Sequence, residues 1–135
     1  MDAAMGLADC FAHFGATGKN QRWSWSARSD DGKVVVITLW QDFFDYRSHP
    51  IVYDTFGRSD LPEWNNPGNR ERLENLRWAR DHCDGLFRVV ITVAEDIKSS
   101  PRKIARCFPQ DRMVMKLLDL NEQTGEFRAI NVGTR

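Results

Sequence analysis

Aromatic side chains are the feature of this sequence best suited to recognising a ligand. The chain has five tryptophans in 135 residues, and Trp23, Trp25 and Trp40 lie within one predicted hairpin. Large aromatic rings stack on planar groups and form cages around cations. In one interpretation Trp23 and Trp25 are only the inward face of a strand. In the other, a pocket is formed by one or more of Trp23, Trp25, Trp40, Tyr46, Tyr53 and Trp64.

Polar and basic residues indicate what such a pocket would hold. Hydroxyl and amide groups can hydrogen-bond the edge of a base that is stacked between aromatic rings. The 19 basic and 19 acidic residues of the whole chain cancel, but the segment 98–116 has six basic residues and one acid. Arginine in particular suits phosphate and base-edge contacts. The predicted polar and basic contacts are Asn20, Arg22, Ser24, Ser26, Lys98, Arg102, Lys103 and Arg106.

Residue types that bind zinc are present, but their spacing is poor. Cys10 and His13 lie three residues apart on a predicted helix, and His82 and Cys83 are adjacent near the end of another. Adjacent helical residues point in different directions, and neither spacing matches a known zinc framework. We therefore expect no metal and no other cofactor.

A metal-dependent nuclease or hydrolase is one alternative function. Asp84 precedes a predicted strand, and Asp96 and Lys98 follow it. If these three side chains converged, they would hold a divalent cation and a water molecule. No serine-histidine-aspartate arrangement or reactive thiol site is apparent in the sequence. A non-enzymatic role is therefore favoured over an enzymatic one.

Length and composition predict a single domain that spans residues 1–135. Three cysteines, an odd number without close pairing, fit reduced thiols better than a disulfide framework. The first residues do not resemble a signal peptide, and no apolar run is long enough to span a membrane. We expect a cytoplasmic protein that does not associate with a membrane.

Hydrophobic periodicity and turn residues predict an order of helix, three strands, helix and three strands. On the second helix, Leu73, Leu76 and Ala79 are expected on the buried stripe, with ion pairs Arg70–Glu74 and Arg77–Asp81 on the exposed side. A helical turn is expected between the fourth and fifth strands, over 102–106. The predicted helices are 3–14 and 67–81, and the predicted strands are 21–29, 33–40, 51–56, 86–94, 113–120 and 126–132.

This order predicts an α+β fold. Because most neighbouring strands are expected to be antiparallel, we expect a small curled sheet or β-barrel of five to six strands with two to three flanking helices. An aromatic pocket on such a sheet would lie at the mouth of the barrel.

The element order, the apolar strand 86–94 running into Glu95-Asp96 and the final hairpin 113–132 resemble the PUA-like superfamily, including its EVE and ASCH branches. The resemblance implies a small β-barrel that binds RNA or modified DNA bases. It also implies that the aromatic residues form the cage, and that the basic segment forms a rim that contacts the nucleic-acid backbone.

The leading hypothesis is therefore a nucleic-acid-binding module that reads a modified or flipped base. A small-ligand or protein-interaction module is the second alternative; it predicts aromatic residues with no adjoining basic rim.

Overall fold

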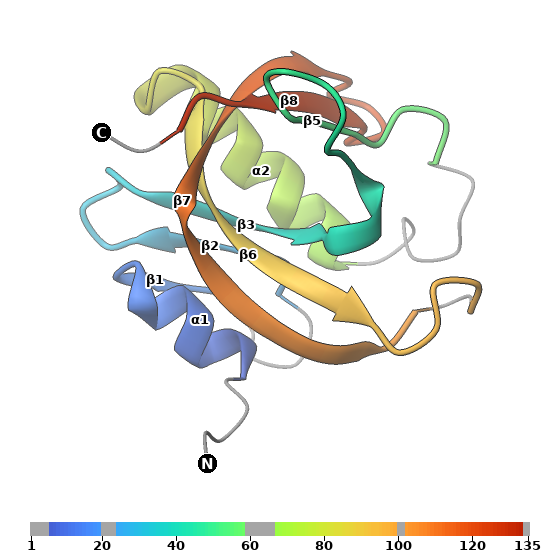
Figure 1. Ribbon diagram of the computed structural model, residues 1–135. Helices are drawn as coiled ribbons and strands as arrows, with labels where there is room; N and C mark the ends of the chain where they lie inside the picture. Colours follow the sequence, from blue (N-terminus) through green and yellow to red (C-terminus); the bar gives the residue numbers. More distant parts are fainter. Residues whose placement is uncertain (1–5, 20–23, 59–66, 100–101, 134–135) are drawn as a thin grey trace.

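The fold is a sheet of eight strands with one helix on each face (Figure 1). The computed structural model describes residues 6–19, 24–58, 67–99 and 102–133. The elements in chain order are α1 (Leu7–His13), β1 (Ala16–Thr17), β2 (Ser26–Ser29), β3 (Val35–Trp40), the 3-10 helix η1 (Gln41–Phe43), β4 (Phe44–Asp45), β5 (Val52–Asp54), α2 (Pro67–His82), β6 (Leu86–Ala94), β7 (Ile104–Leu120) and β8 (Phe127–Asn131).

The centre of the sheet is formed by β3 and β6, which are parallel to each other. Both strands are rich in β-branched residues, and each of their residues is buried or partly buried, as is typical of strands covered on both faces. The strand order is β1-β2-β3-β6-β7-β8-β5-β4, and the other neighbouring pairs of the described strands are antiparallel. The chain between β3 and β6 supplies η1, β4, β5 and α2.

The predicted α+β class is correct, but the predicted curled sheet or barrel of five to six strands is wrong. The sheet is mixed and open, with β1 and β4 at its two ends, and two helices are described. The sequence analysis did not predict β1 and β4. Each of these strands has two residues, too few for an alternation of polar and apolar residues to be visible. The parallel pairing was missed because it joins segments that are far apart in the sequence.

The helical turn expected over 102–106 is also wrong, because this segment enters β7. Ile104 is the register partner of Ala94, and Cys107 is the partner of Thr92. Pairing with the long buried strand β6 therefore overrides the local preference for a turn. Pro109 lies within β7, where only β6 pairs with the strand among the described residues; β8 pairs only with its later part. Proline, which lacks an N–H, is tolerated at such an edge.

Two hydrophobic clusters lie on opposite faces of the sheet because successive side chains of a strand alternate in direction. Val35 and Leu39 of β3 pack in the larger cluster, together with α2. Val36 packs on the other face with Cys10 and Phe11 of α1. The sulfur atoms of Cys10 and Cys107 lie 3.6 Å apart in this smaller cluster, within hydrogen-bond distance, and are not joined by a disulfide.

Helix α2 has the predicted position but a more polar buried face than expected. Leu76 and Ala79 are buried as predicted, whereas Leu73 is half-buried. The buried stripe also includes Asn69, Glu71, Arg72 and Asn75.

Three residues of the ion pairs predicted within α2 have other partners. Glu74 pairs with Lys19, Arg77 pairs with Glu122, and Asp81 pairs with its neighbour Arg80. Among the described residues, no helix is long and apolar enough to cross a membrane.

A turn glycine between β2 and β3 provides a test of the packing of α2. Gly32 has a φ of 73°, and a Cβ atom there would lie 2.8 Å from the ring of Trp78, whose Nε1 donates a hydrogen bond to the Gly32 carbonyl. Gly32→Ala is therefore expected to lower the free energy of unfolding by about 2–4 kcal/mol, from backbone strain and from displacement of the ring.

Gly15→Ala is the matched control because Gly15 has a φ of 74° and nothing lies within 4 Å of a Cβ atom placed there. It should cost about 1–2 kcal/mol, from backbone strain alone. Urea unfolding of both variants measures the difference. Equal losses would show that the contact with Trp78 is not important.

Candidate functional site

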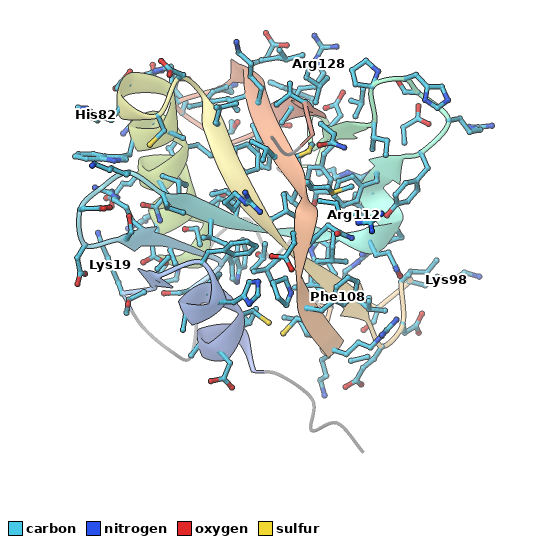
Figure 2. All side chains as sticks on the ribbon, turned by 60° about the vertical axis from the view of Figure 1, so that its left-hand side comes forward. Lys19, His82, Lys98, Phe108, Arg112 and Arg128 are labelled. Carbon is cyan, nitrogen blue, oxygen red and sulfur yellow. The ribbon has the colours of Figure 1, made fainter. Side chains whose placement is uncertain are left out.

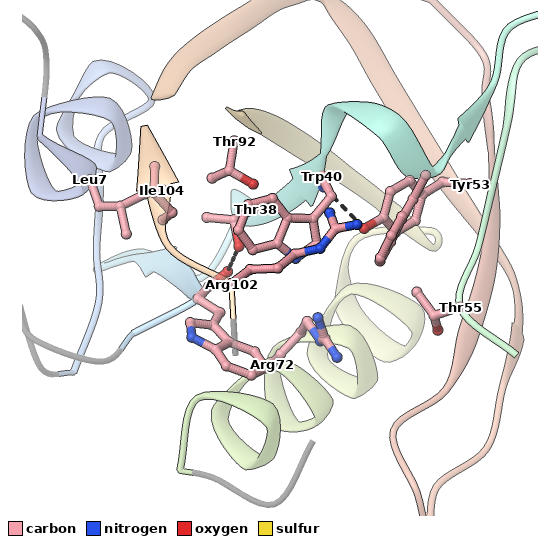
Figure 3. A pocket seen from close by; sticks show the side chains of 11 residues that line it. Leu7, Thr38, Trp40, Tyr53, Thr55, Arg72, Thr92, Arg102 and Ile104 are labelled. Carbon is pink, nitrogen blue, oxygen red and sulfur yellow. Dashed lines mark hydrogen bonds between the residues drawn. The ribbon is translucent and has the colours of Figure 1, made fainter. Parts of the chain in front are cut away.

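A pocket of about 130 Å³ lies where β3 and β6 end (Figure 3). Because these strands are parallel, their carboxyl ends meet, and Trp40 of β3 is the register partner of Thr92 of β6. Segments from both helices, from η1 and from β5 complete the wall. The lining residues are Leu7, Trp25, Thr38, Trp40, Phe43, Tyr53, Thr55, Arg72, Thr92, Arg102 and Ile104.

Aromatic rings form much of this wall. Trp25, Trp40, Phe43 and Tyr53 line the pocket. Tyr53 is fixed by a hydrogen bond in which the backbone N–H of Trp40 donates to its hydroxyl oxygen at 3.0 Å. Burial raises the pKa of Tyr53 to about 12, so the phenol stays protonated at neutral pH. Three of the rings predicted from the sequence are therefore brought together around one cavity.

The threonine hydroxyls of the pocket are already oriented by the backbone. Thr38 donates a hydrogen bond to the carbonyl of Trp25 at 2.9 Å, and Thr92 donates to the carbonyl of Leu39 at 3.2 Å. Each hydroxyl hydrogen is thus used within the protein. The oxygens of Thr38 and Thr92 retain lone pairs that can accept a hydrogen bond.

Arg102 covers one side of the pocket. Its guanidinium donates two hydrogen bonds to Asp42, at 2.6 Å and 2.7 Å, and lies over the rings of Trp40 and Phe43 at 5.0 Å and 4.4 Å from their centroids. Burial by itself raises the pKa of Asp42. The hydrogen bonds and the charge of Arg102 outweigh this effect and hold that pKa below its ordinary value. The ion pair fixes Arg102 between the segment before β7 and η1.

Arg72 enters the pocket from α2 and is only 6% exposed. It donates a hydrogen bond to Oδ1 of Asn69 at 2.9 Å, and its guanidinium lies 5.1 Å from the ring centroid of Trp25 and 5.4 Å from that of Phe127. Burial lowers the pKa of Arg72 to about 10, which still leaves the side chain charged at neutral pH. The two charged side chains in the lining are both arginines, and no carboxylate lines the described pocket.

The other predicted aromatic residues lie elsewhere or outside the described residues. Tyr46 is 50% exposed and stacks on Phe44 away from the pocket lining. The predicted residues Trp23, Trp64, Asn20 and Arg22 fall outside the described residues.

The polar and basic residues predicted for the site are divided between the core, the pocket and the surface. Ser24 and Ser26 are buried, and Ser26 accepts a hydrogen bond from Asn75, so neither is part of the lining. Arg102 lines the pocket. The other three basic residues are exposed beside it and outside the lining: Lys98, Lys103 and Arg106.

The sequence analysis missed seven of the lining residues: Leu7, Thr38, Phe43, Thr55, Arg72, Thr92 and Ile104. A signal for Arg72 was present, because the positions three and four residues away on α2 hold no acid. A helical arginine without an i±4 acidic partner is free to serve a tertiary contact. The threonines have no equivalent signal, because in the sequence they indicate only that these segments form β-strands.

The described residues do not form either of the two metal-binding arrangements considered from the sequence. Asp84 and Asp96 flank opposite ends of β6, a strand about 30 Å long, so the convergence that the nuclease alternative requires is not present. Cys10 and His13 lie on α1, on the other face of the sheet from α2, so they do not meet His82 and Cys83. Among the described residues no three histidine, cysteine or acidic side chains are grouped to hold a metal ion.

No protein-family model matches the chain, and neither the curated proteins nor the solved structures contain a match. The relation to the PUA-like superfamily therefore stays a prediction.

The ion pair that positions Arg102 can be tested by its pH dependence. Asp42→Asn is expected to lower the free energy of unfolding by about 2 kcal/mol at neutral pH, because hydrogen bonds between charged groups stabilise by about 1.5–3 kcal/mol. The pKa of Asp42 is lower in the folded chain than its ordinary value of 3.8. The stabilisation is therefore complete above this value and is lost as the pH falls below it.

Urea unfolding of the wild type and the variant should thus show a difference at about pH 7 that becomes smaller as the pH falls below 3.8. Asp119→Asn is the control because it breaks the pair with Arg128, in which both side chains are about half exposed. This control should cost less than about 1 kcal/mol. A difference for Asp42→Asn that does not change with pH would contradict the ionic account.

Proposed function

We propose that this protein binds nucleic acid and holds one extruded base in the pocket between Trp25, Trp40 and Tyr53. The observation that carries the proposal is the convergence of these rings on one cavity with two arginines in its wall. Every base presents an aromatic face, so stacking on such rings stabilises a base of any sequence by about 1–3 kcal/mol.

The size of the pocket supports a single planar ring as its occupant. A protein cavity of about 150 Å³ is known to hold benzene. The pocket has about 130 Å³ and is open to solvent, so one ring fits while the sugar and phosphate stay outside. Leu7 and Ile104 lie at one end of the pocket and Thr55 at the other, so the ring would be enclosed along its length (Figure 3).

The basic segment beside the pocket favours nucleic acid over a free small ligand. Arg102 and Ile104 line the pocket, and the exposed Lys103 adjoins both in the sequence. Lys98 extends from the fold into solvent (Figure 2). Arg106 is also exposed. A nucleic-acid strand with one base in the pocket would place its phosphates close to these basic side chains. The alternative of a small-ligand or interaction module predicted no such rim.

Binding can be measured with a fluorescein-labelled single-stranded oligonucleotide of about twelve nucleotides at two salt concentrations. We expect binding at low salt that weakens as salt rises, because phosphate contacts release counterions. Trp40→Ala should weaken binding by about fivefold to a hundredfold, because one stacking surface is lost. Trp40→Phe, which keeps a ring, should restore part of the affinity.

Tyr46→Ala is the control, because this ring is exposed and lies outside the pocket. Its affinity should equal that of the wild type. Replacing Lys103 and Arg106 with glutamine should reduce the slope of log affinity against log salt by about 0.7 for each phosphate contact. No binding at low salt, or equal binding by Trp40→Ala and Tyr46→Ala, would contradict the proposal.

A further inference from the structure

The polarity of the pocket wall restricts which base can enter, once base binding as proposed above is accepted. The two charged groups of the described lining are the guanidiniums of Arg72 and Arg102. A guanidinium has only N–H donors and no acceptor. The edge of a ligand that faces either arginine must therefore carry an acceptor such as a carbonyl oxygen, whereas an amino group there would meet another donor.

Tyr53 adds a buried donor of the same kind. Its hydroxyl oxygen accepts the N–H of Trp40, and no acceptor for its own O–H hydrogen is present among the described residues. The side chain is 1% exposed, so this donor has no ready access to bulk water. A buried donor without an acceptor is unfavourable. A carbonyl oxygen in the pocket would remove this cost.

The threonines provide the complementary acceptors. The hydrogens of Thr38 and Thr92 are committed to backbone carbonyls, so their oxygens offer only lone pairs to a ligand. The wall thus combines donors from Tyr53 and the arginines with acceptors from the threonines. The edge of a pyrimidine dione, which alternates carbonyl, N–H and carbonyl, complements this combination. The two pyrimidines differ at the 4-position. With this position directed at Tyr53 and Arg72, a 4-carbonyl accepts their hydrogen bonds, whereas the 4-amino group of cytosine places a donor against donors.

We infer that the pocket selects a 4-oxo pyrimidine, the chemical class of thymine and uracil, and that Tyr53 and Arg72 are its specificity-determining donors. The single-ring size of the cavity favours a pyrimidine over a purine. This inference rests on the proposed binding of an extruded base. It adds which edge of the base is recognised and which side chains form hydrogen bonds with it.

The test compares homo-oligonucleotides of one length, oligo-dT, oligo-dU and oligo-dC, in a fluorescence anisotropy titration at low salt and about pH 7.5. We expect oligo-dT and oligo-dU to bind at least about tenfold more tightly than oligo-dC, because charge-assisted hydrogen bonds discriminate at that level. Free thymidine and deoxycytidine form a second arm, in which the same order at lower affinity assigns the preference to the pocket and not to the strand.

Tyr53→Phe keeps the ring and removes the donor. The preference for oligo-dT over oligo-dC should fall by about fivefold or more, while oligo-dC, bound through stacking and the rim, should change little. Arg72→Gln is the second variant, with the same expected loss of preference. Tyr46→Phe, outside the pocket, is the matched control and should keep the full preference. Urea unfolding of each variant checks that it is folded.

The two levels of the proposal fail in different ways. If no oligonucleotide binds at low salt, base binding itself is wrong. If all three bind with equal affinity and Trp40→Ala weakens each of them, base binding stands and the selection of a 4-oxo pyrimidine is wrong. The preference of the wild-type protein decides the inference even if a variant does not fold. A preference that Tyr53→Phe and Arg72→Gln leave unchanged would overturn the role of these residues.

Discussion

The parallel pairing of β3 with β6 is the constraint on which the pocket depends. Parallel strands cannot be joined by a tight turn, so the chain must travel from one end of the sheet to the other before β6 begins. Here that connection, residues 41–85, supplies η1, β5 and α2. Phe43, Tyr53 and Arg72 come from these three elements. The pairing that builds the centre of the sheet thus also requires the connection that supplies four of the eleven lining residues, Phe43, Tyr53, Thr55 and Arg72.

Cations held against aromatic faces give the site its electrostatic character. Arg102 lies over two rings while Asp42 neutralises it, and Arg72 lies near two rings within the fold. Both arrangements immobilise long side chains before any ligand arrives. Under the proposed function, a ligand would meet donors whose directions are already set, which would lower the entropy lost on binding. Rigid hydrogen-bonding groups of this kind give selectivity, because a mismatched edge cannot be accommodated by a simple rotation.

The sequence predicted those parts of the fold whose signals are local. The β-branched runs of β3 and β6 and the helical periodicity of α2 are visible as patterns, and three of the six proposed aromatic residues line the pocket. The open mixed sheet was not predicted, because strand order depends on contacts between distant segments. The burial of Arg72 was missed for a similar reason. An arginine on a charged helix is expected to be exposed to solvent unless the surface that faces it is known. Here that surface includes Trp25 and Phe127.

The first half of β7 leaves a long backbone edge that, among the described strands, pairs only with β6. An exposed edge of this length is a template on which another chain can add a strand and begin to aggregate. Pro109 interrupts the row of N–H donors there, and Arg106 and Arg112 place positive charges along it. If two copies paired through this edge, the positive charges of Arg106 and Arg112 would lie close together, around Pro109, which has no N–H to donate to a hydrogen bond. This edge is therefore protected against self-association at high concentration by the composition of the strand itself.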